Sequence, residues 1–197
     1  MDDRTLQIIE FIELADGLKS VERAGYLSDG SRRESSAEHV WHTCLMAMLL
    51  HDEASGDDDI DLFHTLEVLI VHDLVEIYAG DVPLHDEEAR KGQEAAELKA
   101  ADELFPKLPA HLGERFRSLW EEFEGNATPE SRFARELDRL QAVIQNIGSK
   151  GRAWKEYQVT EADARRRISK TLEFDRKLEP LFEHLYERAT SNNFWAS

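Results

Sequence analysis

The stretch that decides the fold is Val68-Leu-Ile-Val-His-Asp-Leu-Val-Glu-Ile-Tyr78. On a helix at ~100° per residue, its apolar side chains occupy almost the whole circumference, which predicts a buried helix. Its ionisable residues, His72, Asp73 and Glu76, fall within an arc of about 100°. Such buried groups are costly unless they are paired or bind a metal ion, so the segment predicts a metal site. A histidine bonded to a backbone carbonyl, with two acids at the helix edge, is the plainer alternative.

Helical periodicity extends over most of the remaining chain. Ser35 and Glu38 have the spacing of a capping box, and the apolar run behind them continues to Leu50. Thr128 is a second cap, and Pro129 follows it at the first helical position. Further helices are expected at about 5–19, 61–78, 86–104, 109–125, 128–148 and 160–190.

Glycine and proline mark the expected interruptions. The segment with Gly25 and Gly30 is expected to be a loop, Gly80 should end the helix that holds the deciding stretch, and Pro180 should disturb or end the last helix. No alternating strand pattern of useful length occurs. We therefore expect an all-α fold: one domain over 1–197 with roughly six or seven helices, a motif-bearing core at about 5–150 and a C-terminal helix at about 160–190.

Composition narrows the range of partners. Hydrophobic residues make up 41% of the 197 residues and charged residues 33%, with a formal net charge of −17. Such a surface repels nucleic-acid backbones and anionic membranes, so neither is expected as a partner. The start of the chain has no signal-peptide character and no apolar run approaches ~20 residues, so we expect a cytoplasmic protein. Any site for a phosphorylated metabolite must supply its own positive charge.

Two other segments carry candidate ligands. His39 lies near the start of the helix that Ser35 begins, and His42 follows three residues later. Asp138 lies at the border of the apolar stripe of the 128–148 helix. Taken alone, His39 is weak evidence, and a surface ion pair with Arg135 or Arg139 explains Asp138 equally well.

The order His39, His72-Asp73, Asp138 resembles the pattern that names the HD superfamily of metal-dependent phosphohydrolases. The resemblance is closest to the bacterial 5′-deoxynucleotidases and their HD-domain relatives, and it spans about residues 5–150. It is carried by Glu38-His39, by His-Asp-Leu-Val-Glu-Ile-Tyr-Ala-Gly-Asp-Val-Pro (72–83), by Trp-Glu-Glu-Phe-Glu (120–124) with Thr-Pro-Glu (128–130), and by Glu-Leu-Asp-Arg-Leu (136–140).

The resemblance implies a single HD-domain helical bundle that binds one divalent metal ion. The implied metal ligands are His39, His72, Asp73 and Asp138, and the ion could be Co, Mn, Mg, Zn, Ni or Fe. The family's catalytic carboxylates fall on Glu76 and Asp81, and its phosphate-binding arginine falls on Arg23. The implied reaction is release of phosphate from nucleoside 5′-monophosphates, with deoxynucleotides favoured, by a homodimer. His42 departs from the family pattern, and a packing role is expected for it.

Three other readings remain open. The same site could act on a nucleoside triphosphate or a guanosine alarmone, or the domain could bind a nucleotide without turnover. A helical oxygenase with two irons would need more histidines on the inner faces. Because the stretch from Val40 to Arg90 contains no Lys or Arg before Arg90, the site looks poor in positive charge, which favours a small anion such as a monophosphate.

Overall fold

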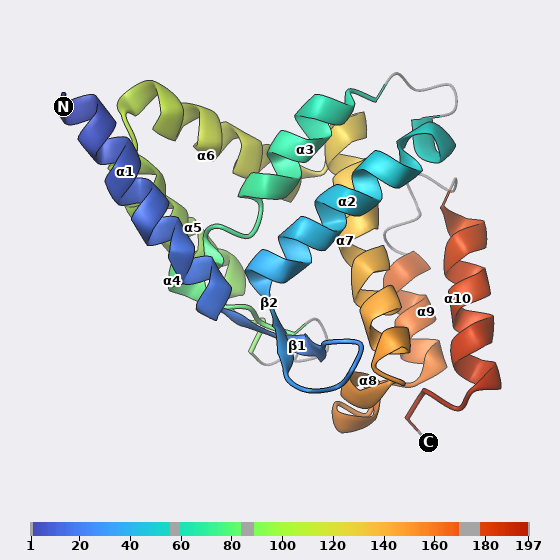
Figure 1. The fold of residues 1–197 in the computed structure, drawn as a ribbon. Coiled ribbons are helices and arrows are strands. Elements are labelled where there is room, and N and C mark those ends of the chain that lie inside the picture. The colour runs from blue at the N-terminus through green and yellow to red at the C-terminus, as the bar shows by residue number, and fades with distance from the viewer. Residues whose placement is uncertain (1, 56–59, 84–88, 170–177, 197) are drawn as a thin grey trace.

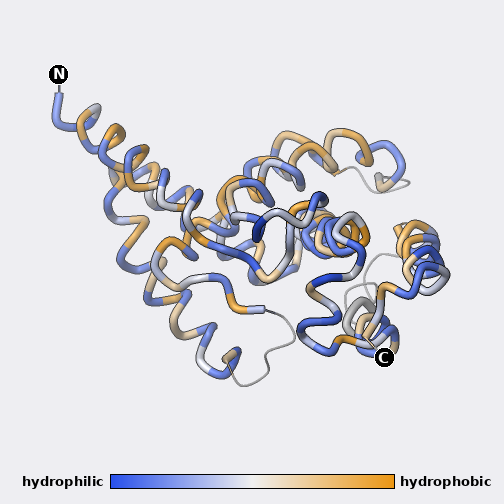
Figure 2. Tube along the Cα trace, turned by 60° about the horizontal axis from the view of Figure 1, so that its bottom comes forward, coloured by the Kyte–Doolittle hydropathy of each residue, from blue (hydrophilic) through white to orange (hydrophobic). Residues whose placement is uncertain are grey.

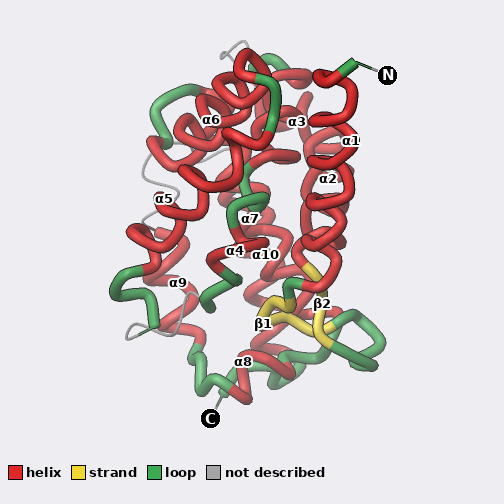
Figure 3. Tube along the Cα trace, turned by 90° about the vertical axis from the view of Figure 1, so that its left-hand side faces the viewer, coloured by secondary structure: helices red, strands yellow, loops and turns green. Residues whose placement is uncertain are grey.

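The computed structural model describes residues 2–55, 60–83, 89–169 and 178–196. Helices make up nearly all of the described secondary structure (Figures 1 and 3). In chain order the elements are α1 (Asp3–Ala15), η1 (Asp16–Ser20), β1 (Glu22–Tyr26), β2 (Arg33–Ser35), α2 (Ser36–Ser55), α3 (Leu62–Val71), α4 (Glu76–Ala79), α5 (Gln93–Leu104), η2 (Phe105–Lys107), α6 (Ala110–Gly125), α7 (Pro129–Gly148), α8 (Arg152–Glu156), α9 (Glu161–Ser169) and α10 (Glu179–Ser191).

The centre of the fold is formed by α2, α3 and α7, which contact one another. In α3, Val68 and Leu69 are completely buried, as the apolar circumference of that segment predicts. On α7, Leu137 and Leu140 are also completely buried. Most of the outer helices are amphipathic, and Figure 2 shows polar and apolar residues alternating along them. The expected all-α fold is therefore confirmed.

The predicted helix caps are present. Glu38 N–H donates to Ser35 Oγ at 3.3 Å while Ser35 N–H donates to Glu38 Oε2 at 3.0 Å, which completes the capping box of α2. Thr128 caps α7 by accepting from Ser131 N–H, and Pro129 occupies the first helical position. These two caps fix where the two longest described helices begin.

The helix expected at 61–78 is instead broken at the His-Asp pair. α3 ends at Val71 and α4 begins at Glu76. Between them the backbone bonds are three residues apart, as from Leu74 N–H to Val71 O at 3.1 Å and from Glu76 N–H to Asp73 O at 3.0 Å. Residues three apart are eclipsed in such a tightened turn, so Asp73 and Glu76 share one face. Gly80, with φ of 75°, then ends α4 as predicted.

A short hairpin replaces the loop expected around Gly25 and Gly30. β1 and β2 pair antiparallel, with Glu22 opposite Ser35 and Tyr26 opposite Arg33. Figure 3 shows this hairpin next to the start of α2 and to α8. The sequence Glu-Arg-Ala-Gly-Tyr of β1 has no alternation that would have revealed it.

Several other boundaries differ from the prediction. The chain is divided into more and shorter helices than six or seven. The helix expected from residue 86 begins at Gln93, after Gly92 in a left-handed conformation, and residues 84–88 lie outside the described part. Pro180 does not end a helix but lies in the first turn of α10, where its missing N–H is tolerated.

None of the described helices has the length and apolarity that a membrane span requires.

Candidate active site

The four predicted ligands come from the three central helices and lie together. His39 is in the first turn of α2, His72 follows the last residue of α3, Asp73 is next to it, and Asp138 is in the middle of α7. His39 Nε2 lies 2.9 Å from Asp138 Oδ1 and 3.9 Å from Asp73 Oδ2. His72 Nε2 lies 3.0 Å from Asp73 Oδ1. His39, His72 and Asp73 are buried and Asp138 is half-buried.

Both imidazole rings are held through their other nitrogen. His39 Nδ1 lies 2.7 Å from Gln141 Oε1, and His72 Nδ1 lies 2.7 Å from the carbonyl oxygen of Leu69. These oxygens can only accept, so each Nδ1 carries the hydrogen and each Nε2 presents a lone pair. Both Nε2 atoms are buried and, among the described residues, neither takes part in a hydrogen bond.

This arrangement fits one divalent metal ion. Two ligand atoms at ~2.1 Å from an ion and at right angles to each other lie about 3 Å apart, which matches the two shortest nitrogen–oxygen distances of the cluster. The ligand atoms of His39, His72 and Asp138 all lie within 4.8 Å of one another. Two imidazoles and two carboxylates form a mixed N and O set, which suits a borderline divalent ion. An ion would also satisfy both orphaned Nε2 atoms.

The protonation states of the ligands agree with this fit. Burial lowers the pKa of His39 to about 4, and it lowers the pKa of His72 as well. Both rings are therefore neutral at pH 7, the form in which histidine binds a metal. Burial raises the pKa of Asp73 to about 8, although the nearby Arg23 opposes this shift. A positive ion between these groups would restore the ionised carboxylate.

Arg23 extends from β1 into the middle of the acidic cluster. Its Nη1 lies 3.1 Å from Asp73 Oδ2, 3.9 Å from Glu76 Oε1 and 3.7 Å from Asp81 Oδ1, and its Nη2 lies 3.7 Å from Asp138 Oδ1. Burial would lower the pKa of Arg23, but the four carboxylates together raise it above its usual value. The guanidinium therefore stays charged, and its planar donors suit phosphate oxygens at this position.

The two predicted catalytic carboxylates, Glu76 and Asp81, both lie next to the guanidinium group of Arg23. Glu76 is buried, and its Oε2 accepts a hydrogen bond of 2.6 Å from Ser36 Oγ. Burial raises the pKa of Glu76, and the neighbouring Asp73 raises it further. Asp81 follows Gly80, and its carboxylate faces Arg23. The structure thus brings together every site residue predicted from the sequence.

Two buried polar residues near the ligands were not predicted. Gln141 lies three residues after Asp138 on α7, and Glu34 lies in β2; both are buried. Gln141 Nε2 donates to Glu34 Oε1 at 2.7 Å, which directs Gln141 Oε1 toward His39. A glutamine on the apolar stripe of α7 is a signal that could have been noticed. His42 lies beside Gln141, with 3.3 Å between its Nδ1 and Gln141 Nε2, and does not belong to the ligand cluster.

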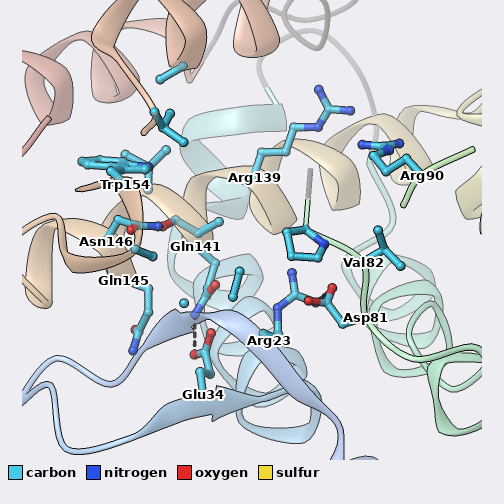
Figure 4. A pocket seen from close by; sticks show the side chains of 18 of the residues that line it. Arg23, Glu34, Asp81, Val82, Arg90, Arg139, Gln141, Gln145, Asn146 and Trp154 are labelled. Carbon is cyan, nitrogen blue, oxygen red and sulfur yellow. Dashed lines mark hydrogen bonds and ion pairs between the residues drawn. The ribbon is translucent and has the colours of Figure 1, made fainter. Parts of the chain in front are cut away.

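A pocket of about 530 Å³ lies beside the cluster and shares Arg23 and Asp81 with it. Arg23 and Asp81 lie at one end of it, and Trp154 and Asn146 lie at the other (Figure 4). The volume is within the range of small-ligand sites. Arg139, which follows Asp138 on α7, also lines the pocket. The pocket has more positive charge than the sequence argument expected, because Arg90 and Arg166 from distant segments line it as well.

The chain is similar in sequence to proteins named as 5′-deoxynucleotidases. A 5′-deoxynucleotidase of Xenopus laevis is 30% identical over 141 residues, which is 71% of this chain and 68% of the relative. The human 5′-deoxynucleotidase is 27% identical over 139 residues, which is 70% of this chain and 66% of the relative.

The similarity to solved structures covers more of this chain than the similarity to these two relatives does. A predicted metal-dependent phosphohydrolase from Magnetospirillum magnetotacticum has 34% identity and a TM-score of 0.89, with 100% of both chains covered. A conserved hypothetical protein from Pyrococcus furiosus has 27% identity and a TM-score of 0.69, with 91% of this chain and 99% of that one covered. The model of the HD domain family matches residues 15–179. Together with the site geometry, these findings show that the chain belongs to the HD domain family.

Proposed function

We propose that this chain is a metal-dependent phosphohydrolase that releases phosphate from 2′-deoxynucleoside 5′-monophosphates. The observation that carries the proposal is the pair of orphaned Nε2 atoms, on His39 and His72, beside a charged arginine at the end of a nucleotide-sized pocket. The activity named for the relatives from Xenopus laevis and Homo sapiens supports the same substrate.

In this proposal, His39, His72, Asp73 and Asp138 hold one divalent ion. When bound, the ion offsets the charge of the phosphoryl group and lowers the pKa of a water molecule. Arg23 holds the remaining phosphate oxygens and keeps the phosphorus in line with that water.

Glu76 is the proposed general base. Ser36 fixes its Oε2, which leaves Oε1 facing the cluster, where it can accept the proton of the attacking water. Its buried position favours proton uptake. Asp81 is proposed to act beside Arg23, where its carboxyl group, after taking up a proton from solvent, can give that proton to the leaving sugar oxygen.

A second candidate has support from one observation. Arg90, Arg139 and Arg166 line the pocket beyond Arg23. A triphosphate chain needs several cations, so these arginines favour a nucleoside triphosphate or an alarmone more than the sequence did. The monophosphate remains the leading proposal because of the relatives.

The domain organisation, the oligomeric state and the absence of macromolecular partners other than a second copy are also proposals. We infer one domain over 1–197 and a homodimer, with no nucleic-acid or membrane partner. The homodimer is supported by α2, where Trp41, Met48 and Leu49 expose large apolar side chains. The cytoplasmic location remains a prediction from sequence.

Substrate class is the first test. Phosphate release should be measured for matched deoxynucleoside mono-, di- and triphosphates with several divalent metals, and for the ribonucleotides. We expect the highest kcat/KM for the deoxynucleoside monophosphates, with inorganic phosphate as the product. A higher kcat/KM for the triphosphate, or tripolyphosphate as product, would replace this proposal with the triphosphohydrolase.

Glu76→Ala should keep the metal and lose turnover by a factor of roughly 10²–10⁴, because the residue is proposed to act on water and not on the ion. Metal content is measured by elemental analysis and turnover by phosphate release. Glu67→Ala, on α3 and paired with Arg115 outside the site, is the matched control and should stay near wild type. An empty metal site in Glu76→Ala, with normal activity after reloading, would show that its role is ligation.

Gln141→Leu should weaken metal binding by roughly 10–100-fold, because His39 loses the partner that fixes its ring and tautomer. Calorimetric titration with Mn²⁺ measures this without any need for turnover. Gln145→Leu is the control one turn further along α7, since Gln145 is also buried but donates to Tyr26 O, away from the ligands. Equal losses in both variants would mean that the effect comes from disturbed packing of α7.

A further inference from the structure

Glu34 is a buried acid with half of its bonding capacity unused. The residue is 4% exposed, and its Oε1 accepts the hydrogen bond from Gln141 Nε2. Its Oε2 has no hydrogen bond or ion pair with any residue that the structure describes. Because Glu34 lines the pocket, this oxygen can be reached from it, and a donor that enters the site could bond it.

The unused oxygen lies on the side of Glu34 that is next to Gly25. A Cβ placed on Gly25, across the hairpin in β1, would lie 3.9 Å from Glu34 Oε2. Glu34 and Gly25 both line the pocket, together with Arg23. Burial raises the pKa of Glu34 to about 7, and the positive charge of Arg23 opposes this rise. The carboxyl group is therefore close enough to the phosphate end of the pocket to respond to its charge.

Different residues line the two ends of the pocket and the part between them. In Figure 4, Glu34 and Gln141 lie between Arg23 with Asp81 on one side and Asn146 with Trp154 on the other. The lining of the pocket also includes the apolar side chains Val143, Trp154, Val159 and Ala164, which suit the faces of a nucleobase. A nucleotide with its phosphate at Arg23 and its base at Trp154 would place its sugar beside Glu34.

We propose that Glu34 recognises the sugar of the substrate. In this proposal its Oε2 accepts a hydrogen bond from the free 3′-hydroxyl of the sugar. This inference rests on the proposed function. A 2′-deoxynucleoside 5′-monophosphate has no other sugar hydroxyl to donate, and a carboxylate is a strong acceptor for one. A phosphate on the 3′-oxygen would remove the donor and bring negative charge against the acid. The substrate class is therefore the free mononucleotide, not a 3′-phosphorylated nucleotide or the 5′ end of a strand.

The test pairs two substrates with variants of one residue. Wild-type enzyme should hydrolyse a deoxynucleoside monophosphate with a kcat/KM on the order of 10–100-fold above that of the 2′,3′-dideoxy analogue with the same base. In Glu34→Leu the two values should become equal within about twofold, because the acceptor is gone. Any damage passed through Gln141 to His39 affects both substrates and cancels in this ratio.

Two further variants keep the test decisive. Glu34→Gln preserves the size of the side chain and covers the case in which the leucine variant does not fold; its discrimination should fall well below that of wild type. Glu38→Gln is the control, because Glu38 caps α2 and pairs with Arg32 and is not among the residues that line the pocket. Its discrimination should match that of wild type. Equal rates of wild-type enzyme on the two substrates, or unchanged discrimination in the Glu34 variants, would overturn the inference.

Binding separates this inference from the proposed reaction. The dissociation constants of the same two nucleotides should be measured by calorimetry with the metal-loaded protein. If no phosphate is released but the Kd ratio depends on Glu34 as described, the inference stands and the reaction is wrong. If phosphate is released without any dependence on Glu34, the reaction stands and the inference is wrong.

Discussion

Two buried imidazoles with unsatisfied Nε2 atoms are the constraint on which the rest of this structure depends. Each ring is fixed by an acceptor at Nδ1, from Gln141 for His39 and from the backbone of Leu69 for His72. Their lone pairs therefore face the same small space as the carboxylates of Asp73 and Asp138. Leaving these atoms unpaired in a dry interior is unfavourable, and one cation removes the penalty for all of them.

The fold brings the ligands together because the three helices that carry them, or end next to them, contact one another. α2 supplies its first turn, α3 its C-terminal end and α7 its middle, and the apolar surfaces of these helices hold them in contact. The tightened turn after Val71 brings Asp73 and Glu76 closer to alignment on one face than a continuous α-helix would. The hairpin then brings Arg23 and Glu34 to the same region. Positive charge is thus concentrated at the pocket of a chain with a net charge of −17.

Much of this could be predicted from the sequence, and the reasons are local. Capping residues such as Ser35 and Thr128 act on their own helix, so they set the starts of α2 and α7 correctly. The ionisable residues of the 68–78 segment stood out because its other positions are apolar. His39 and Asp138 needed the family resemblance, since their spacing alone left a surface role open.

The rest depends on contacts that sequence patterns do not encode. The apolar periodicity is the same on both sides of the break after Val71, so this periodicity could not predict the tightened turn. The hairpin forms by pairing two short segments with no alternation. Glu34 and Gln141 are 107 residues apart, and only the folded chain shows that they bond. The arginines at the pocket come from separate segments for the same reason.

The central claim is that His39, His72, Asp73 and Asp138 hold one ion. Anomalous diffraction from a crystal of the Mn²⁺-loaded protein tests this most directly. The account predicts one strong peak at bonding distance, about 2.0–2.3 Å, from Nε2 of both histidines and from a carboxylate oxygen of both aspartates. A well-ordered structure with the ion bound elsewhere, or with Asp138 directed to solvent while the other three ligands hold the ion, would contradict it.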